Sequence, residues 1–109
     1  MRKRTTQTQQ AEAEKVIGAI TTYKGDEHAF MKGCKVRIVA VLRNAARADY
    51  NPDAEDGYIK DEEYLHATGG VTAGDRIEVQ PWVDKAGRFS WVTSDPKATD
   101  LLAFEHLVK

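Results

Sequence analysis

The sequence predicts a mainly β domain, a small barrel or a strongly bent antiparallel sheet, with α+β as the alternative class. Three stretches lead to this prediction: a β-prone run at residues 36–42, an alternating polar and apolar run at 76–80, and a hairpin pattern at 82–92. A chain of 109 residues is expected to form one domain. We place that domain at residues 11–109, after a polar and basic tail at residues 1–10.

Apolar residues near the N-terminus recur every three or four positions, which is typical of an amphipathic helix. They are Ala13, Val16, Ile17, Ile20 and Tyr23. We expect a helix over residues 9–18 and a strand directly after it. A homo-oligomer through Val16, Ile17 and Ile20 is a further expectation, because a helix outside a small barrel must bury its apolar face.

The β-prone run places Val36, Ile38, Ala40 and Leu42 on one face of a strand, if its side chains alternate regularly. Arg37 and Arg43 then lie together on the opposite face. A turn at residues 72–75 is expected to lead into the second strand, at 76–80.

The third stretch contains a four-residue connection, 84–87, that ends in glycine. This suits a type I turn closed by a glycine bulge, and so predicts a hairpin. Asp95 and Pro96 are an expected N-cap and first residue of a short C-terminal helix that runs to Ala103. Residues 104–108 are expected to form a last strand.

Two glycine-led stretches, 33–38 and 74–79, resemble strand openings in SH3-like small β-barrels, including the KOW type. The resemblance implies an architecture for the sheet. It carries no functional residue over to this chain.

Acidic side chains dominate the connection at residues 49–63. Asn51, Asp53, Glu55 and Glu62 have the spacing of oxygen ligands in a calcium loop, but Asp56 stands where such a loop needs glycine. We therefore interpret this connection as a solvated surface loop, and we expect no metal and no cofactor. A small enzyme with a carboxylate site is left open as an alternative.

Other chemistries lack their signatures. The single cysteine, Cys34, has no motif that places His28, His66 or His106 beside it, and the glycine pair at 69–70 lacks the remainder of a phosphate-binding loop. No apolar run approaches the ~20 residues of a membrane-spanning helix, and no apolar segment follows the basic start, so no signal peptide is expected. These observations favour a cytoplasmic protein that is not an enzyme.

We expect a binding module for a protein or for a basic or proline-rich peptide, because aromatic faces beside carboxylates attract cations. The expected binding residues are Tyr50, Asp53, Glu55, Asp56, Tyr58, Tyr64, Trp82 and Trp91.

The alternative is a nucleic-acid-binding barrel, although a net charge of −1 argues against a dedicated nucleic-acid binder. Its basic stripe would be Lys35, Arg37, Arg43 and Arg47. Tyr23, Trp82 and Trp91 would then stack on bases.

Overall fold

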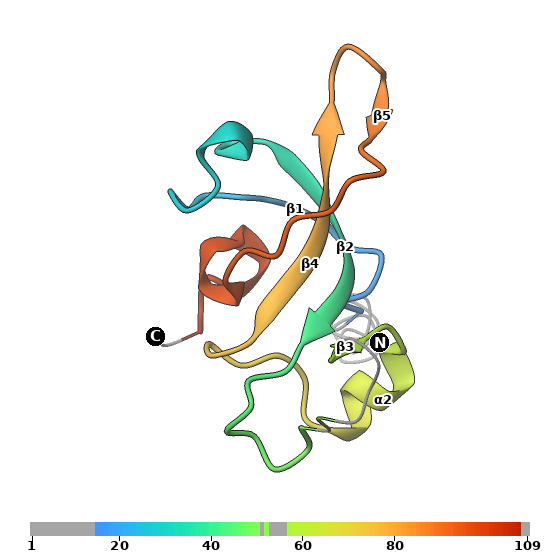
Figure 1. The fold of residues 1–109 in the computed structure, drawn as a ribbon, viewed down its shortest axis with the longest axis vertical. Coiled ribbons are helices and arrows are strands. Elements are labelled where there is room, and N and C mark those ends of the chain that lie inside the picture. Colours follow the sequence, from blue (N-terminus) through green and yellow to red (C-terminus); the bar gives the residue numbers. More distant parts are fainter. Residues whose placement is uncertain (1–14, 51, 53–56, 108–109) are drawn as a thin grey trace, which may run out of the picture.

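A sheet of five antiparallel strands forms the domain in the computed structural model, which describes residues 15–50, 52 and 57–107. The strands are β1 (Ile20–Thr22), β2 (Lys35–Leu42), β3 (Tyr58–Ile59), β4 (Arg76–Val83) and β5 (Arg88–Phe89) (Figure 1). Helix is scarce, so the mainly β class is confirmed. Among the described residues, no helix is long and apolar enough to cross a bilayer.

β2 is the central strand. β4 pairs along one of its edges, while β1 and β3 share the other edge, β1 near the start of β2 and β3 near its end. β4 continues into the predicted hairpin with β5, where Trp82 pairs with Phe89. Gly87 in the turn has a φ of 65°, which is the left-handed conformation that a glycine bulge requires.

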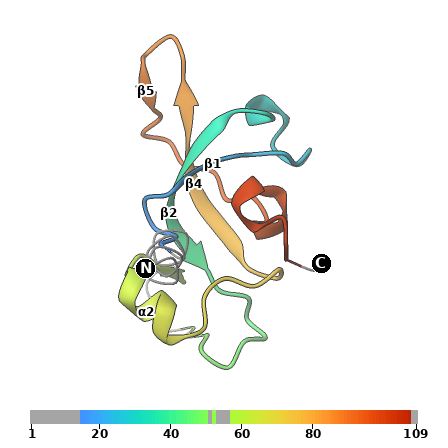
Figure 2. The same ribbon diagram turned by 180° about the vertical axis from the view of Figure 1, so that it is seen from behind.

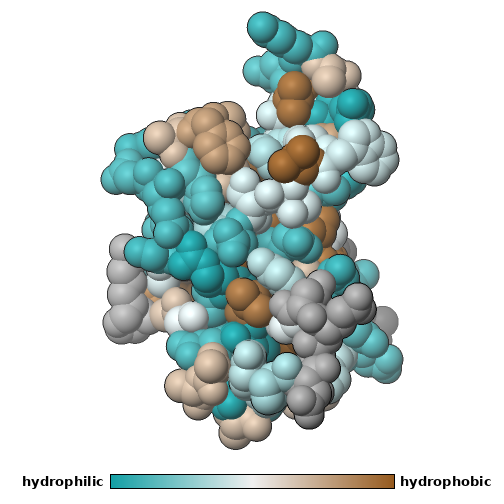
Figure 3. Space-filling model, viewed as in Figure 1, coloured by the Kyte–Doolittle hydropathy of each residue, from teal (hydrophilic) through white to brown (hydrophobic). Residues whose placement is uncertain are grey.

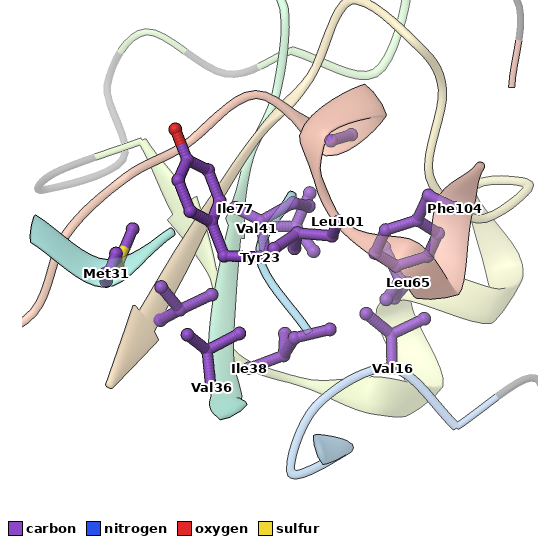
Figure 4. Packing of buried hydrophobic residues seen from close by; sticks show 12 residues of the cluster. Val16, Tyr23, Met31, Val36, Ile38, Val41, Leu65, Ile77, Leu101 and Phe104 are labelled. Carbon is purple, nitrogen blue, oxygen red and sulfur yellow. The ribbon is translucent and has the colours of Figure 1, made fainter. Parts of the chain in front are cut away.

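The chain after β5 crosses one face of the sheet, as the two opposite views show (Figures 1 and 2). It pairs with β4 at Ser94 and Lys97, and with the end of β1 where Leu101 bridges to Tyr23. The core lies between this segment and the sheet, and Figure 4 shows Tyr23, Ile77 and Leu101 within it.

A β-bulge in β2 changes which side chains reach the core. Ile38 pairs with Val79 and Val41 pairs with Ile77, so one extra residue lies between these two core pairs. The prediction that Leu42 shares a face with Val36 and Ile38 is therefore wrong. The bulge shifts the alternation by one residue, and Val41 takes the inner position instead.

The predicted helices differ from those found. Residues 9–14 of the predicted N-terminal helix lie outside the described residues. Its remaining part is not helical, because residues 15–16 are irregular and residues 17–18 form a turn. The C-terminal helix is replaced by two short 3-10 helices, η2 (Ala98–Asp100) and η3 (Leu102–Phe104). Leu101 interrupts them in an extended conformation because it bridges to Tyr23. Residues 104–107 of the predicted last strand end η3 and continue as turns.

Two helices were not expected: η1 (Ala29–Met31) and α2 (Glu62–Ala67). α2 begins within the acidic loop, where the Asp61 side chain accepts hydrogen bonds from the amides of Glu63 and Tyr64. Leu65 is the only buried residue of α2, so the apolar periodicity that reveals longer helices is missing.

Candidate functional site

The outer face of the sheet, opposite the core, is open near the hairpin. Arg37 of β2 lies between Ile20 of β1 and Gln80 of β4. Arg37 alternates with buried Val36 and Ile38, so its side chain points to the outer face. Ile20 is 55% exposed, and Arg37 and Gln80 are half-buried. No described element covers this part of the sheet.

The Arg37 side chain is held in place from two directions. Its Nε and Nη2 atoms donate to Gln80 Oε1 at 3.1 and 2.7 Å. Its guanidinium carbon lies 4.7 Å from the centroid of the Phe89 ring. Nη1 has no hydrogen-bond partner within the described part of the chain. The outer edge of the guanidinium, formed by Nη1 and Nη2, therefore remains open to a ligand.

Two aromatic rings continue this arrangement toward the end of the hairpin. Trp82 and Phe89 pack edge to face, with ring centroids 5.0 Å apart. Lys35 Nζ lies 5.5 Å from the Trp82 ring centroid, and Asp84 accepts a hydrogen bond of 2.8 Å from the indole nitrogen. We call Lys35, Arg37, Gln80, Trp82 and Phe89 the cation–aromatic surface.

A third cation–aromatic pair lies across the hairpin. Arg88 lies 5.6 Å from the Trp91 ring, and Arg88 and Phe89 are successive strand residues that point to opposite sides. Trp91 is 80% exposed and Val92 is 75% exposed. Figure 3 shows apolar side chains at the surface over this hairpin, where most of the same face is hydrophilic.

Charge is distributed unevenly along the chain. Residues 35–38 and 80–91, which contain the cation–aromatic surface, hold four positive side chains and one negative, a formal net charge of +3. Residues 44–63 hold seven negative side chains and two positive, a net charge of −5. These two parts belong to opposite ends of β2 and β4.

A buried network of ions occupies the other end of the sheet. Arg43 is 3% exposed and Asp75 is 1% exposed; their closest charged atoms are 3.3 Å apart. Arg47 lies 3.5 Å from the same Asp75 oxygen. Arg43 also donates to Thr68 Oγ1 and to the Gly70 carbonyl oxygen. The buried charge of Arg43 is thus paired, as burial requires, although its Nε atom forms no hydrogen bond with the residues that the structure describes and only lies 3.4 Å from Asp49 Oδ2.

Asp49 and Asp75 complete the network. Asp75 accepts hydrogen bonds from the backbone amides of Asn44 and Thr72, so it joins two loops. Asp49 accepts from Arg47 Nε at 3.0 Å. This hydrogen bond, aided by the charge of Arg43, lowers the pKa of Asp49 below its usual value.

The structure divides the predicted basic stripe. Lys35 and Arg37 lie on the open face, while Arg43 and Arg47 are engaged in the ion network. Tyr23 is fully buried, so its ring cannot stack on a base as predicted.

The predicted binding residues also fall into separate groups. Tyr58 pairs with Leu42 near the end of β2, where β4 begins. Trp82 lies six residues further along β4, about 20 Å away at 3.3 Å per residue. Tyr64 is 46% exposed on α2, Tyr50 is half-buried, and Trp91 lies on the far side of the hairpin.

Three predicted binding residues, Asp53, Glu55 and Asp56, lie outside the described residues. Glu62, considered as a calcium ligand, instead accepts hydrogen bonds from the backbone amides of Val16 and Ile17, at 2.7 Å each. Of these two apolar residues, Val16 belongs to the core and Ile17 packs against it. Within the described ranges, no three histidine, cysteine or acidic side chains gather as a metal site would require.

Sequence reasoning missed Gln80 and Phe89 as site residues. The alternation of Gln80 with Val79 indicates that Gln80 faces outward. Its position opposite Arg37 depends on the register between β2 and β4, which residue patterns alone do not specify.

No protein-family model, curated protein or solved structure matches this chain at a significant level.

Proposed function

We propose that this domain is a non-enzymatic binding module whose cation–aromatic surface binds single-stranded nucleic acid. The observation that carries the proposal is the pair of cations, Arg37 and Lys35, that lie beside the rings of Phe89 and Trp82 on an open sheet face. A single strand needs cations for its phosphates and flat groups for its bases. This surface offers both.

The ligand should be single-stranded because a duplex hides the faces of its bases. Aromatic rings and guanidinium planes both serve as stacking partners for unpaired bases. Arg37 offers a guanidinium plane already oriented by Gln80 and Phe89, so little side-chain freedom is lost on binding.

The charge distribution supports the same placement. Residues 44–63, with a net charge of −5, repel a polyanion, whereas residues 35–38 and 80–91, with a net charge of +3, attract it. A strand is therefore expected to cross the hairpin end of the sheet and to avoid the acidic end.

We also infer a small SH3-like barrel as the scaffold. Support comes from the chain after β5, which pairs with β4 at one edge of the sheet and with the end of β1 at the other. Such a segment draws the two edges together over the core.

Fluorescence anisotropy with a labelled 12-nucleotide single strand of mixed sequence tests the proposal. The double variant Lys35→Ala/Arg37→Ala should lower affinity by about tenfold or more, and should reduce the slope of log K against log salt by about 0.7 for each of the two cations that contacts a phosphate. The matched variant Lys85→Ala/Arg88→Ala removes the same charge from the other side of the hairpin. It should lower affinity by no more than about threefold.

Two results would contradict the proposal. One is the absence of any binding to single-stranded DNA or RNA at low salt. The other is equal affinity for a base-free polyanion, such as a heparin fragment, because it would remove any role for the rings.

A peptide of basic character is the second candidate ligand, and it would bind at the acidic end. The observation that favours it is Tyr64, which is 46% exposed on α2 directly after residues 44–63. The same titration with an arginine-rich peptide distinguishes the two candidates. Tyr64→Ala should weaken binding of the peptide and leave binding of the oligonucleotide unchanged.

A further inference from the structure

We infer that Arg37 contacts guanine, so that the cation–aromatic surface prefers single strands that contain this base. The inference rests on the proposed function, and it concerns which ligand atoms the site selects. In the unbound protein, Arg37 already donates two hydrogen bonds to Gln80.

The pair presents only donors to a ligand. Gln80 Oε1 is occupied by two hydrogen bonds from Arg37, which leaves the Gln80 amide nitrogen as a donor. Arg37 uses its Nε–Nη2 edge for Gln80, which leaves the Nη1–Nη2 edge as a two-pronged donor. A complementary ligand therefore presents two neighbouring acceptors to this edge.

Guanine meets this requirement best among the bases. Its O6 and N7 are adjacent acceptors, and a bidentate arginine contact to them is the commonest specific contact in protein–DNA recognition. Adenine has the N6 amino donor beside N7, which would face a donor of the site. Cytosine also has neighbouring acceptors, N3 and O2, but its single ring offers less area than the two rings of guanine for stacking beside Phe89 and Trp82.

The residues of the site have different roles. Arg37 is the residue that touches the base, while Gln80 and Phe89 are positioning residues that fix its guanidinium plane. A phosphate also has two acceptors that would fit the same edge. The experiment must therefore separate a base contact from a phosphate contact.

Four labelled 12-nucleotide strands with the repeat TTN make this separation, where N is guanine, adenine, cytosine or 7-deazaguanine. Isolated guanines avoid quadruplex formation, and 7-deazaguanine lacks only the N7 acceptor. The guanine strand should bind about tenfold tighter than the adenine and cytosine strands. The 7-deazaguanine strand should lose most of this preference.

Variants then assign the preference to residues. Arg37→Lys keeps the charge but lacks the two-pronged edge, so it should bind all four strands alike, within about threefold of the wild-type affinity for the adenine strand. Gln80→Leu should reduce the guanine preference and leave thermal stability nearly unchanged, which a merely structural role would not do. Arg88→Lys is the matched control and should keep the full preference.

The outcomes separate the two proposals. If no strand binds, the proposed function fails. If all four strands bind equally, or 7-deazaguanine binds as guanine does, then nucleic-acid binding stands, and the guanine inference is overturned in favour of a phosphate contact. A stronger preference for cytosine also overturns it.

Discussion

Arg37 and Arg43 lie six residues apart on one stretch of chain, yet they have opposite surroundings. Arg43 follows the end of β2 and is buried against Asp75. Arg37, within β2, faces the open side of the sheet and keeps one edge of its guanidinium unpaired within the described chain. The comparison shows how one sheet holds a structural cation at one end and a candidate ligand-binding cation at the other.

The β-bulge between Ile38 and Ala40 explains the difference. In a regular strand, residues 37 and 43 would share a face because side chains alternate with a period of two. The extra residue in β2 turns Arg43 to the inner face, where it meets Asp75 just before β4 begins. Arg37 lies before the bulge and stays outside.

The two positions also differ in what folding requires of them. Burying Arg43 removes most of its water, so the network around Asp75 must supply replacement partners. Arg37 is only half-buried, and its contacts with Gln80 and Phe89 orient it without using all of its donors.

The largest expected effect is the loss of stability when the buried cation is removed. Arg43→Met should lower the free energy of unfolding by about 3 kcal/mol, because Asp75 loses a buried partner. Arg37→Met, the matched change on the open face, should cost less than about 1 kcal/mol. Urea denaturation at pH 7 measures both values.

Equal losses of stability for the two methionine variants would mean that Arg37 stabilises the fold as much as Arg43 does. A small loss for Arg43→Met would show that Arg47 alone compensates the Asp75 charge.

A smaller effect is expected at the hairpin. Gly87 has a φ of 65° and no atom within 4 Å of an added Cβ, so Gly87→Ala should cost only backbone strain, about 1 kcal/mol. Hydrogen exchange should quicken at the Gly87 amide, which bonds to the Val83 carbonyl, and stay slow at the Ile77 amide in the core.

Gly87→Asn is the control, because asparagine tolerates the left-handed conformation better than alanine and should cost less. Faster exchange at Ile77 as well would mean that the hairpin and the core unfold as one unit.

Much of the sheet could be predicted from local patterns. β2, β4 and the hairpin follow from β-branched runs and from the glycine at position 87, and the structure confirms them. The bulge could not be predicted, because it depends on which residues of β4 face those of β2. Since the bulge decides which arginine is buried, the sequence could name Lys35 and Arg37 as candidates but could not separate them from Arg43. The helix α2 was not predicted because it buries only Leu65, so its sequence has no apolar periodicity.

The smallest expected effect is the loss of the Asp49 contribution to stability at acidic pH. The Arg47 hydrogen bond lowers the pKa of Asp49 in the folded state, so Asp49 contributes stability above its unfolded pKa of about 3.9. That contribution is lost as the pH falls below 4 and passes through the lower folded-state pKa. Asp49→Asn should therefore be less stable than wild type at pH 7, and the difference should shrink below pH 4. Thermal unfolding between pH 7 and pH 2.5 measures it.

Asp26→Asn serves as the control, since the pKa of Asp26 is lowered too, but by Lys32 alone and at an exposed position. Half-molar salt should abolish the effect of Asp26→Asn and leave most of the effect of Asp49→Asn, because partly buried pairs are screened less than exposed ones. If salt abolishes both effects alike, Asp49 behaves as a surface ion. The protected network would then contain Arg43 and Asp75 alone, and the contrast between the two ends of the sheet would rest on that one pair.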